Sequence, residues 1–175
     1  MTSSDLRRAF GAFTTGVVIV GARDGEGSLV GMTANSFTSV SLAPPLALFC
    51  PAKSLSAFGA YYSARYFSVN VLDAAQRELS ERFARPGNAK WSAVAHELGA
   101  NGTPLIPSAL AQFECEVVQR VEAGDHAVIL GRVLLARCAE HGEPLAFFRS
   151  RYRGLDSQVP AGHTDEQLWQ LGWGL

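Results

Sequence analysis

The chain has 175 residues, which is enough for one domain that buries about 70% of the surface of its unfolded form. Hydrophobic residues make up 47% of it and its net charge is −1, so the composition excludes a disordered chain and a strong field for nucleic acid or anionic lipid. Charged residues are only 18%, against about 25% in a typical domain, which suggests that a partner subunit, a ligand or both cover part of the surface.

The first fifty residues predict a short helix followed by three strands. Leu6, Phe10 and Phe13 lie at helical spacing on one face of the helix. Ser4 or Asp5 would cap its first turn. Strands are predicted over 14–21, 29–37 and 46–50. Four large apolar residues are assigned to core or dimer packing: Phe10, Phe13, Leu79 and Leu110.

The remaining residues predict short helices among further strands. Helices are expected over 54–62 and 73–84, and strands over 66–72, 111–121, 126–139 and 145–148. Trp91 and Leu98 would anchor the irregular segment 86–107, and Thr164 would cap a C-terminal helix. Antiparallel hairpins dominate and long β-α-β crossovers are scarce, so the pattern predicts a mainly-β fold, a small β-barrel with added helices.

The cysteines and the apolar runs indicate where the protein works. Cys50, Cys115 and Cys138 are odd in number, lie in apolar stretches and show no C-x-x-C spacing, so we expect buried thiols in a reducing cytosol. Arg7-Arg8 before an apolar run faintly resembles a twin-arginine signal, but the run is too short. No stretch approaches the roughly 20 apolar residues that span a bilayer. The expectation is a soluble cytoplasmic protein with no membrane partner.

Several motifs for other chemistries fail on spacing. Gly25, Gly27 and Gly31 precede a strand instead of opening a helix, so they do not form a dinucleotide fingerprint. The four histidines show no ligand spacing, and no metal is expected. The basic and aromatic segment 149–153 has three interpretations: a solvated strand end, a contact to a phosphorylated small molecule, or a contact to single-stranded nucleic acid. With a net charge of −1 and no second basic cluster, nucleic acid is not an expected partner.

The segment 31–58 carries the chemistry of the chain. Seven small or short polar residues lie within 32–41, where a strand that only covered a core would carry larger apolar side chains. Short side chains let a ligand approach the backbone, and Asn35 can match the edge of a planar heterocycle. Lys53 and Ser54 open the next predicted helix, where a cation, a hydroxyl and helix N–H groups suit a phosphate. The alternatives are a polar edge strand and a solvated loop lysine.

Five motifs in a fixed order resemble the short-chain NAD(P)H:flavin oxidoreductase family. They are TANSFTSVS at 33–41, PPLALFC at 44–50, FSVNVL at 67–72, GDHAVILGRV at 124–133 and PLAFFRSRY at 144–152. The resemblance implies a split β-barrel of the FMN-binding type, a homodimer, which binds FMN or FAD and takes hydride from NADH or NADPH. It also implies that reduced flavin passes to a separate flavin-dependent monooxygenase. The domain would cover 1–155, followed by a tail with a short helix over 156–175.

The resemblance also implies the residues of a flavin site. Those implied along the ring and the ribityl chain are Met32, Thr33, Ala34, Asn35, Ser36, Ser39, Val40, Ser41, Phe49, Cys50, Pro51 and Ala52. Those implied near phosphate, near the outer end of the flavin or its adenylate, and in the closing segment are Lys53, Ser54, Ser56, Phe83, Arg85, Lys90, Trp91, Phe148, Arg149 and Tyr152. Ala57 stands where the family often has threonine, which removes one possible phosphate-side hydroxyl.

His126 matches the family histidine beside the nicotinamide and is the expected catalytic residue. Its local alternative is a turn residue hydrogen-bonded to Asp125. His126 and the segment 149–152 favour a reductase over a flavin carrier or sensor, because a flavin holder needs no nicotinamide site. An oxidase acting on a small amine would need a cationic substrate pocket, and the sequence shows none. FMN and FAD, and NADH and NADPH, all stay open.

Overall fold

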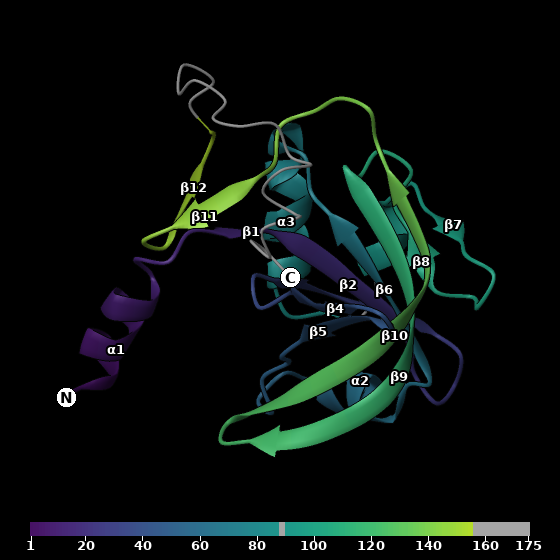
Figure 1. Ribbon diagram of the computed structural model, residues 1–175, viewed down its shortest axis with the longest axis horizontal. Helices are drawn as coiled ribbons and strands as arrows, with labels where there is room; N and C mark the ends of the chain where they lie inside the picture. The colour runs from purple at the N-terminus through teal and green to yellow at the C-terminus, as the bar shows by residue number, and fades with distance from the viewer. Residues whose placement is uncertain (88–89, 156–175) are drawn as a thin grey trace.

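A seven-stranded antiparallel sheet forms the body of the computed structural model, which describes residues 1–87 and 90–155 (Figure 1). Its strands, in spatial order, are β3 (Leu29–Ala34), β2 (Val18–Arg23), β6 (Tyr66–Val71), β9 (Ala111–Ala123), β10 (His126–Cys138), β5 (Pro45–Phe49) and β4 (Thr38–Leu42). The edge strands β3 and β4 follow one another along the chain, yet no ladder joins them within the described residues. The mainly-β prediction is therefore confirmed, and the sheet does not close into a barrel in the described part of this chain.

Two small sheets and three short helices surround this body. The small sheets are β1 (Thr15–Gly16) with β11 (Ala146–Phe148) and β12 (Arg151–Arg153), and β7 (Glu97–Leu98) with β8 (Pro104–Leu105). The helices are α1 (Ser3–Phe10), α2 (Phe58–Ser63) and α3 (Arg77–Ala84), with 3₁₀ turns η1 (Ala74–Gln76) and η2 (Lys90–Ala93). Among the helices of the described residues, none has the length and apolar content needed to cross a bilayer.

The core lies on both faces of β2, because successive side chains of a strand point to opposite faces. Val18 and Val20 belong to one buried cluster with Phe49, Phe67 and Ile129. Helix α2 covers this face with Tyr61, whose hydroxyl donates a hydrogen bond to the Val20 carbonyl at 3.1 Å. On the other face, Val17 and Ile19 pack in a second cluster with Leu72, Phe83 and Trp91, which brings α3 and η2 onto the sheet.

The long β9–β10 hairpin is the predicted hairpin, observed close to its expected bounds. Two bulges interrupt its ladder, at Leu130/Gly131 and at Val133/Leu135, and bulges increase the twist of a strand pair. A Cβ at Gly131 would lie 2.5 Å from the Phe67 ring, so glycine lets the sheet curl tightly around that ring. The turn end of the hairpin lies beside α2 in Figure 1, away from β11 and β12.

Several predicted bounds were wrong. Thr2 caps α1 in place of Ser4 or Asp5, because its hydroxyl accepts from the Asp5 N–H at 3.1 Å. The predicted helix over 54–62 begins at Phe58, since 51–57 form turns. The strand expected over 29–37 ends at Ala34, and a separate strand, β4, follows. Asp73 caps the 3₁₀ turn η1, after which α3 begins.

Four residues expected to be buried are exposed. Phe10 is 73% exposed and Phe13 is 77% exposed, because α1 projects from the sheet and buries no residue in this chain (Figure 1). Leu98 is 54% exposed on the two-residue strand β7, so it does not anchor its segment as Trp91 does. Cys138 is exposed at the end of β10. Leu79 and Leu110 are half-buried, and Leu79 packs on the second cluster. The helix expected at Thr164 and the tail 156–175 lie outside the described residues.

Candidate functional site

The short polar segment at the end of β3 lines a pocket of ≈ 260 Å³ between β3, α3 and β11–β12. The lining residues are Val17, Thr33, Ala34, Asn35, Ser80, Ala84, Phe147 and Tyr152. Small side chains on β3 leave this space open, and Asn35 is exposed at its rim. Three residues implied by the sequence, Thr33, Ala34 and Asn35, thus lie together and face solvent-accessible space.

A chain of hydroxyl groups holds the floor of this pocket together. The Thr33 hydroxyl donates to the Ser80 carbonyl at 2.6 Å, and the Ser80 hydroxyl lies 2.9 Å from the Tyr152 hydroxyl. The Tyr152 ring packs edge-on against Phe147 with centroids 5.5 Å apart, and the Arg77 guanidinium lies 5.3 Å from its centroid. These contacts fasten β3 to α3 and α3 to β12, so three distant segments form one wall.

A second pocket of ≈ 210 Å³ adjoins the first, since Ala84 lines both. Its lining residues are Val30, Gly31, Ser54, Leu55, Ser56, Ala57, Ala84, Arg85, Pro86, Gly87 and Lys90. The hydroxyls of Ser54 and Ser56 and the guanidinium of Arg85 give this pocket the donors that suit an anion. Two neighbouring pockets, one with an amide and short polar side chains and one with cationic and hydroxyl groups, suit a planar ring that carries a phosphate.

Lys90 lines the second pocket, but its ammonium group serves the fold. It donates to the Gly31 carbonyl at 3.1 Å and to the Phe83 carbonyl at 2.9 Å, which ties η2 to β3 and α3. Partial burial lowers the pKa of Lys90. Arg85 is exposed, so it is the cation of this pocket with the greater access to a ligand.

The segment after β5 lies between the polar end of β3 and the β9–β10 turn. The Cys50 N–H donates to the Ser36 hydroxyl at 3.0 Å, which joins the ends of the two segments. Partial burial raises the pKa of the Cys50 thiol. The Lys53 N–H donates to the Asp125 carbonyl at 2.8 Å, and Ala52 bridges His126. The segment 50–53 therefore connects the implied flavin residues to the implied catalytic histidine.

His126 is half-exposed at the first position of β10. Its Nδ1 lies 2.8 Å from the Asp125 carboxylate, and the hydrogen bond from His126 lowers the pKa of Asp125. Because a carboxylate only accepts, this contact assigns the ring proton to Nδ1 and leaves Nε2 for another partner. The structure therefore shows the contact of the local interpretation, and the catalytic role of His126 stays a prediction.

Four implied cofactor residues have little exposed surface. Phe49, Phe83, Trp91 and Met32 are exposed by 0%, 1%, 4% and 6%, and all belong to the two core clusters. Phe83 and Trp91 pack edge-on with centroids 4.6 Å apart. Pro51 is also buried. The Phe83 and Trp91 rings pack against Gly31, which lines the second pocket, so they support its wall from behind.

Other implied residues lie outside the lining of both pockets. Ser39, Val40 and Ser41 lie on the edge strand β4, and Phe148 and Arg149 lie at the β11–β12 turn. The Arg149 guanidinium stacks over the Phe148 ring at 5.1 Å. The sequence interpretation missed Ser80, Phe147 and Val17. A signal for Ser80 existed, because it lies three residues before Phe83 on the buried face of an amphipathic helix.

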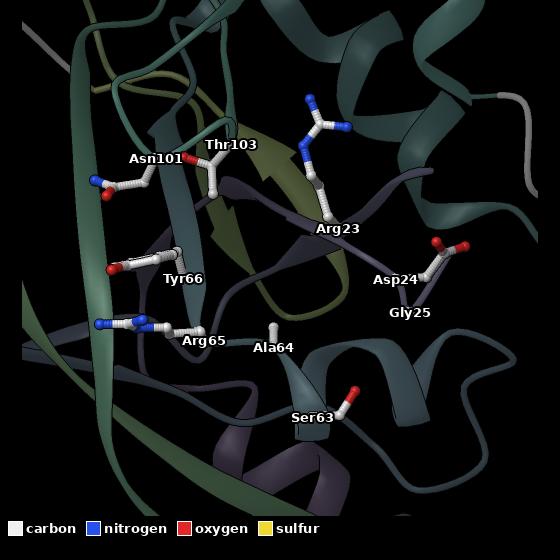
Figure 2. Close-up of a pocket in the computed structure, with 9 residues that line it drawn as sticks. All are labelled: Arg23, Asp24, Gly25, Ser63, Ala64, Arg65, Tyr66, Asn101 and Thr103. Atoms are coloured by element: carbon white, nitrogen blue, oxygen red, sulfur yellow. The ribbon is translucent and has the colours of Figure 1, made fainter. Parts of the chain in front are cut away.

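A pocket at the other end of the sheet offers a contrast (Figure 2). It measures ≈ 240 Å³ and none of the implied site residues lines it. Arg23 donates to the Gly102 carbonyl at 2.7 Å, and Arg65 pairs with Glu116 at 3.4 Å, so both cations already have partners. Figure 2 shows the Arg23 guanidinium pointing away from Arg65 and Tyr66. The described residues hold no cluster of side chains suited to a metal ion.

Comparisons with known proteins show which proteins the chain resembles. The family described as "Flavin reductase like domain" matches residues 10–156. The FMN reductase (NADH) SmoA of Agrobacterium fabrum is 48% identical over 145 residues, which cover 83% of this chain and 82% of SmoA. The reductase component of the flavin-dependent trigonelline monooxygenase of Acinetobacter baylyi is 40% identical over 129 residues, covering 74% of this chain and 42% of that protein.

A solved structure matches with a TM-score of 0.84 and 38% identity, the Streptomyces globisporus NADH:FAD oxidoreductase SgcE6 in complex with NAD and FAD fragments. The match covers 89% of this chain and 94% of SgcE6. Several curated relatives are longer, and the chain spans 41%, 56% and 42% of the length of three of them.

Proposed function

The chain belongs to the flavin reductase like family, and from that premise we propose that it is an NADH-dependent flavin reductase that reduces FMN or FAD by hydride transfer. The observation that carries the proposal is the backbone bridge between His126 and Ala52, on the segment that leads to Ser54 and Ser56 in one of two adjoining pockets of complementary chemistry. His126 itself lines neither pocket. A flavin carrier would need the pockets alone, whereas a reductase also needs a group beside the nicotinamide.

The residues present fit a flavin mononucleotide portion. Thr33, Ala34 and Asn35 would line the ring, while Ser54, Ser56 and Arg85 would hold the phosphate. When bound, the flavin supplies the centre that accepts hydride. The protein contributes by holding two flat rings in contact and excluding water between them. His126 Nε2 would hydrogen-bond the nicotinamide amide, with the ring fixed by Asp125 at Nδ1.

A homodimeric split β-barrel is the finer part of the proposal. Large apolar side chains are exposed on the β9–β10 hairpin, on β4 and at the N-terminus: Val118, Val121, Leu134, Val40, Leu42, Phe10 and Phe13. A second subunit that covered these side chains would remove their apolar surface from water, which supports a dimer. Light scattering should give twice the mass of the chain, and a monomeric mass would contradict a dimer.

A separate monooxygenase is the proposed recipient of the reduced flavin. The relative from Acinetobacter baylyi is a reductase component of such a system. Both pockets are open to solvent in this chain, which suits a flavin that leaves after reduction. The partner receives the flavin by diffusion, so no interface between the two proteins is required.

The decisive experiment follows NADH absorbance in air with purified protein and either FMN or FAD, without an organic substrate. We expect flavin-dependent loss of NADH. His126→Ala should lose most kcat/KM for NADH and keep its affinity for flavin. If wild-type protein binds flavin but oxidises neither NADH nor NADPH, the chain is a carrier or sensor and the reductase proposal fails.

The phosphate pocket has its own test. Arg85→Met should weaken FMN binding by about tenfold, because a charge-assisted hydrogen bond is lost, and should leave riboflavin binding unchanged. Riboflavin is the control ligand, because it has the same ring and ribityl chain as FMN but lacks the phosphate. Equal affinity of the variant and wild type for FMN would remove Arg85 from the proposed site.

A further inference from the structure

A polar cluster at the turn end of the β9–β10 hairpin has no role in the proposed function. The Lys53 ammonium pairs with the Glu122 carboxylate across the gap between segment 50–53 and the end of β9. The Tyr62 hydroxyl, from α2, hydrogen-bonds the same carboxylate. Glu122 therefore connects three segments that are far apart in the sequence: the turn after β5, helix α2 and the hairpin.

Backbone hydrogen bonds also join segment 50–53 to the turn of the β9–β10 hairpin. The Lys53 N–H donates to the Asp125 carbonyl at 2.8 Å, and the Ala127 N–H donates to the Pro51 carbonyl at 3.1 Å. These bonds bracket His126, whose backbone bridges Ala52. The Lys53–Glu122 pair lies beside them. One side-chain contact and two backbone hydrogen bonds therefore hold segment 50–53 against the part of the hairpin that carries His126. We call these three contacts the 53–122 clasp.

The pairing of Lys53 bears on its expected role near phosphate. Ser54, Ser56 and Arg85 line the second pocket, the one suited to an anion. Lys53 is not among its lining residues. Lys53 is 39% exposed in its side chain, and Glu122 is 55% exposed, so the ion pair sits at the surface next to His126. The charge of Lys53 is balanced by Glu122. Arg85 lines the pocket of Ser54 and Ser56, which has no acidic lining residue, and also a neighbouring pocket lined by Glu78 and Glu81.

We propose that Lys53 and Glu122 are positioning residues for His126, which act on the nicotinamide half of the reaction and not on the flavin phosphate. This inference rests on the proposed function, because it assigns the clasp to the same site. Tyr62 supports the carboxylate from helix α2. The clasp keeps the His126 backbone beside Ala52, so that the ring is presented where the two cofactors would meet.

The test compares Lys53→Met, Glu122→Gln and the double variant with wild type. Each single variant should raise the KM for NADH about fivefold, the size that one exposed ion pair can supply. The double variant should be no worse than either single variant, because both remove the same contact. Affinities for FMN and for riboflavin should stay at wild-type values. Hydrogen exchange of the Ala127 amide should accelerate by a similar factor.

Glu116→Gln is the matched control. Glu116 lies on the same strand and pairs with Arg132 at 2.6 Å across the same hairpin, away from segment 50–53. The Glu116→Gln variant should leave the KM for NADH and the hydrogen exchange of the Ala127 amide unchanged.

Two results would overturn the inference. The first is a loss of FMN affinity in Lys53→Met, without a loss of riboflavin affinity, together with tighter FMN binding in Glu122→Gln. That pattern makes Lys53 a phosphate ligand with which Glu122 competes. The second is an unchanged KM and unchanged exchange in both variants. If wild-type protein shows no NADH oxidation, the proposed function fails, and the role of the clasp in the reaction fails with it. Hydrogen exchange of the Ala127 amide still decides whether the clasp holds segment 50–53 against the hairpin.

Discussion

Gly31 shows how closely the backbone of β3 approaches the aromatic side chains beneath the pockets. A Cβ at this position would lie 2.4 Å from the Phe83 ring and 2.7 Å from Trp91 Nε1. Both rings are buried, so neither can move aside cheaply. Gly31→Ala should lower the free energy of unfolding by about 1–3 kcal/mol, measured by urea denaturation.

Gly59→Ala is the control for this substitution, because a Cβ at Gly59 meets nothing within 4 Å and the residue lies in α2. It should leave stability unchanged or raise it by up to about 1 kcal/mol. Equal stability of the two variants would show that the wall beneath the pockets is more deformable than the contacts indicate.

The three thiols differ in reactivity because their burial differs. Cys138 is exposed, Cys50 is half-buried and Cys115 is buried. Burial, followed by the nearby Glu114 carboxylate, raises the pKa of Cys115 to about 12, so almost no thiolate forms at mildly alkaline pH. A thiol reagent should label Cys138 first and Cys115 only after unfolding, with peptide mass spectrometry as the measurement. Rapid labelling of Cys115 in native protein would contradict its buried position.

At the scale of elements, Tyr152 joins β12 to α3 through the Ser80 hydroxyl and the Arg77 guanidinium. The Tyr152 hydroxyl lies 2.9 Å from the buried Ser80 hydroxyl. Tyr152→Phe and Ser80→Ala should each cost about 0.5–1.5 kcal/mol of stability, and the double variant should cost little more than one of them. Thermal unfolding of the four proteins measures this cycle. Fully additive losses would mean that the two hydroxyls do not stabilise each other.

Element types were predictable from local pattern, but element edges were not. The β9–β10 hairpin follows from β-branched runs on both sides of a glycine turn, which is information within the segment. The start of α2 at Phe58 instead depends on the turns over 51–57, which are held by Asp125 and Ala127 from the hairpin. A local pattern contains no record of such a contact.

At the scale of the whole molecule, paired carboxylates make the free energy of unfolding depend on pH. The hydrogen bond from Arg132 lowers the pKa of Glu116, and the hydrogen bond from Lys53 lowers the pKa of Glu122. The bond from His126 lowers the pKa of Asp125, and the backbone N–H of Thr2 lowers the pKa of Asp5. Each of these carboxyl groups has a lower pKa in the folded protein than in the unfolded chain. Their interactions therefore stabilise the fold above the unfolded pKa, and this stabilisation is lost as the pH falls through the folded pKa.

The free energy of unfolding should therefore hold from neutral pH to about pH 5 and fall below the ordinary glutamate and aspartate values of 4.5 and 3.8. Urea unfolding down to about pH 3 measures this. Glu116→Gln should show a shallower fall, because one of the titrating groups is gone. Stability that is constant or rising as the pH drops below 4.5 would contradict the lowered pKa values.

The sequence by itself determined the mainly-β class, the long hairpin and the order of five motifs that carries the family resemblance. The strands, the hairpin turn and each motif depend on residues that are close together along the chain, and the order of the motifs follows directly from the sequence. Only the tertiary structure decided which motif residues reach open space, because packing between distant segments sets exposure. Phe83 and Trp91 were implied at the flavin, yet they lie in the core, while Ser80 entered the pocket wall through contacts to Thr33 and Tyr152. The pairing of Lys53 with Glu122 likewise joins residues that only the fold brings together.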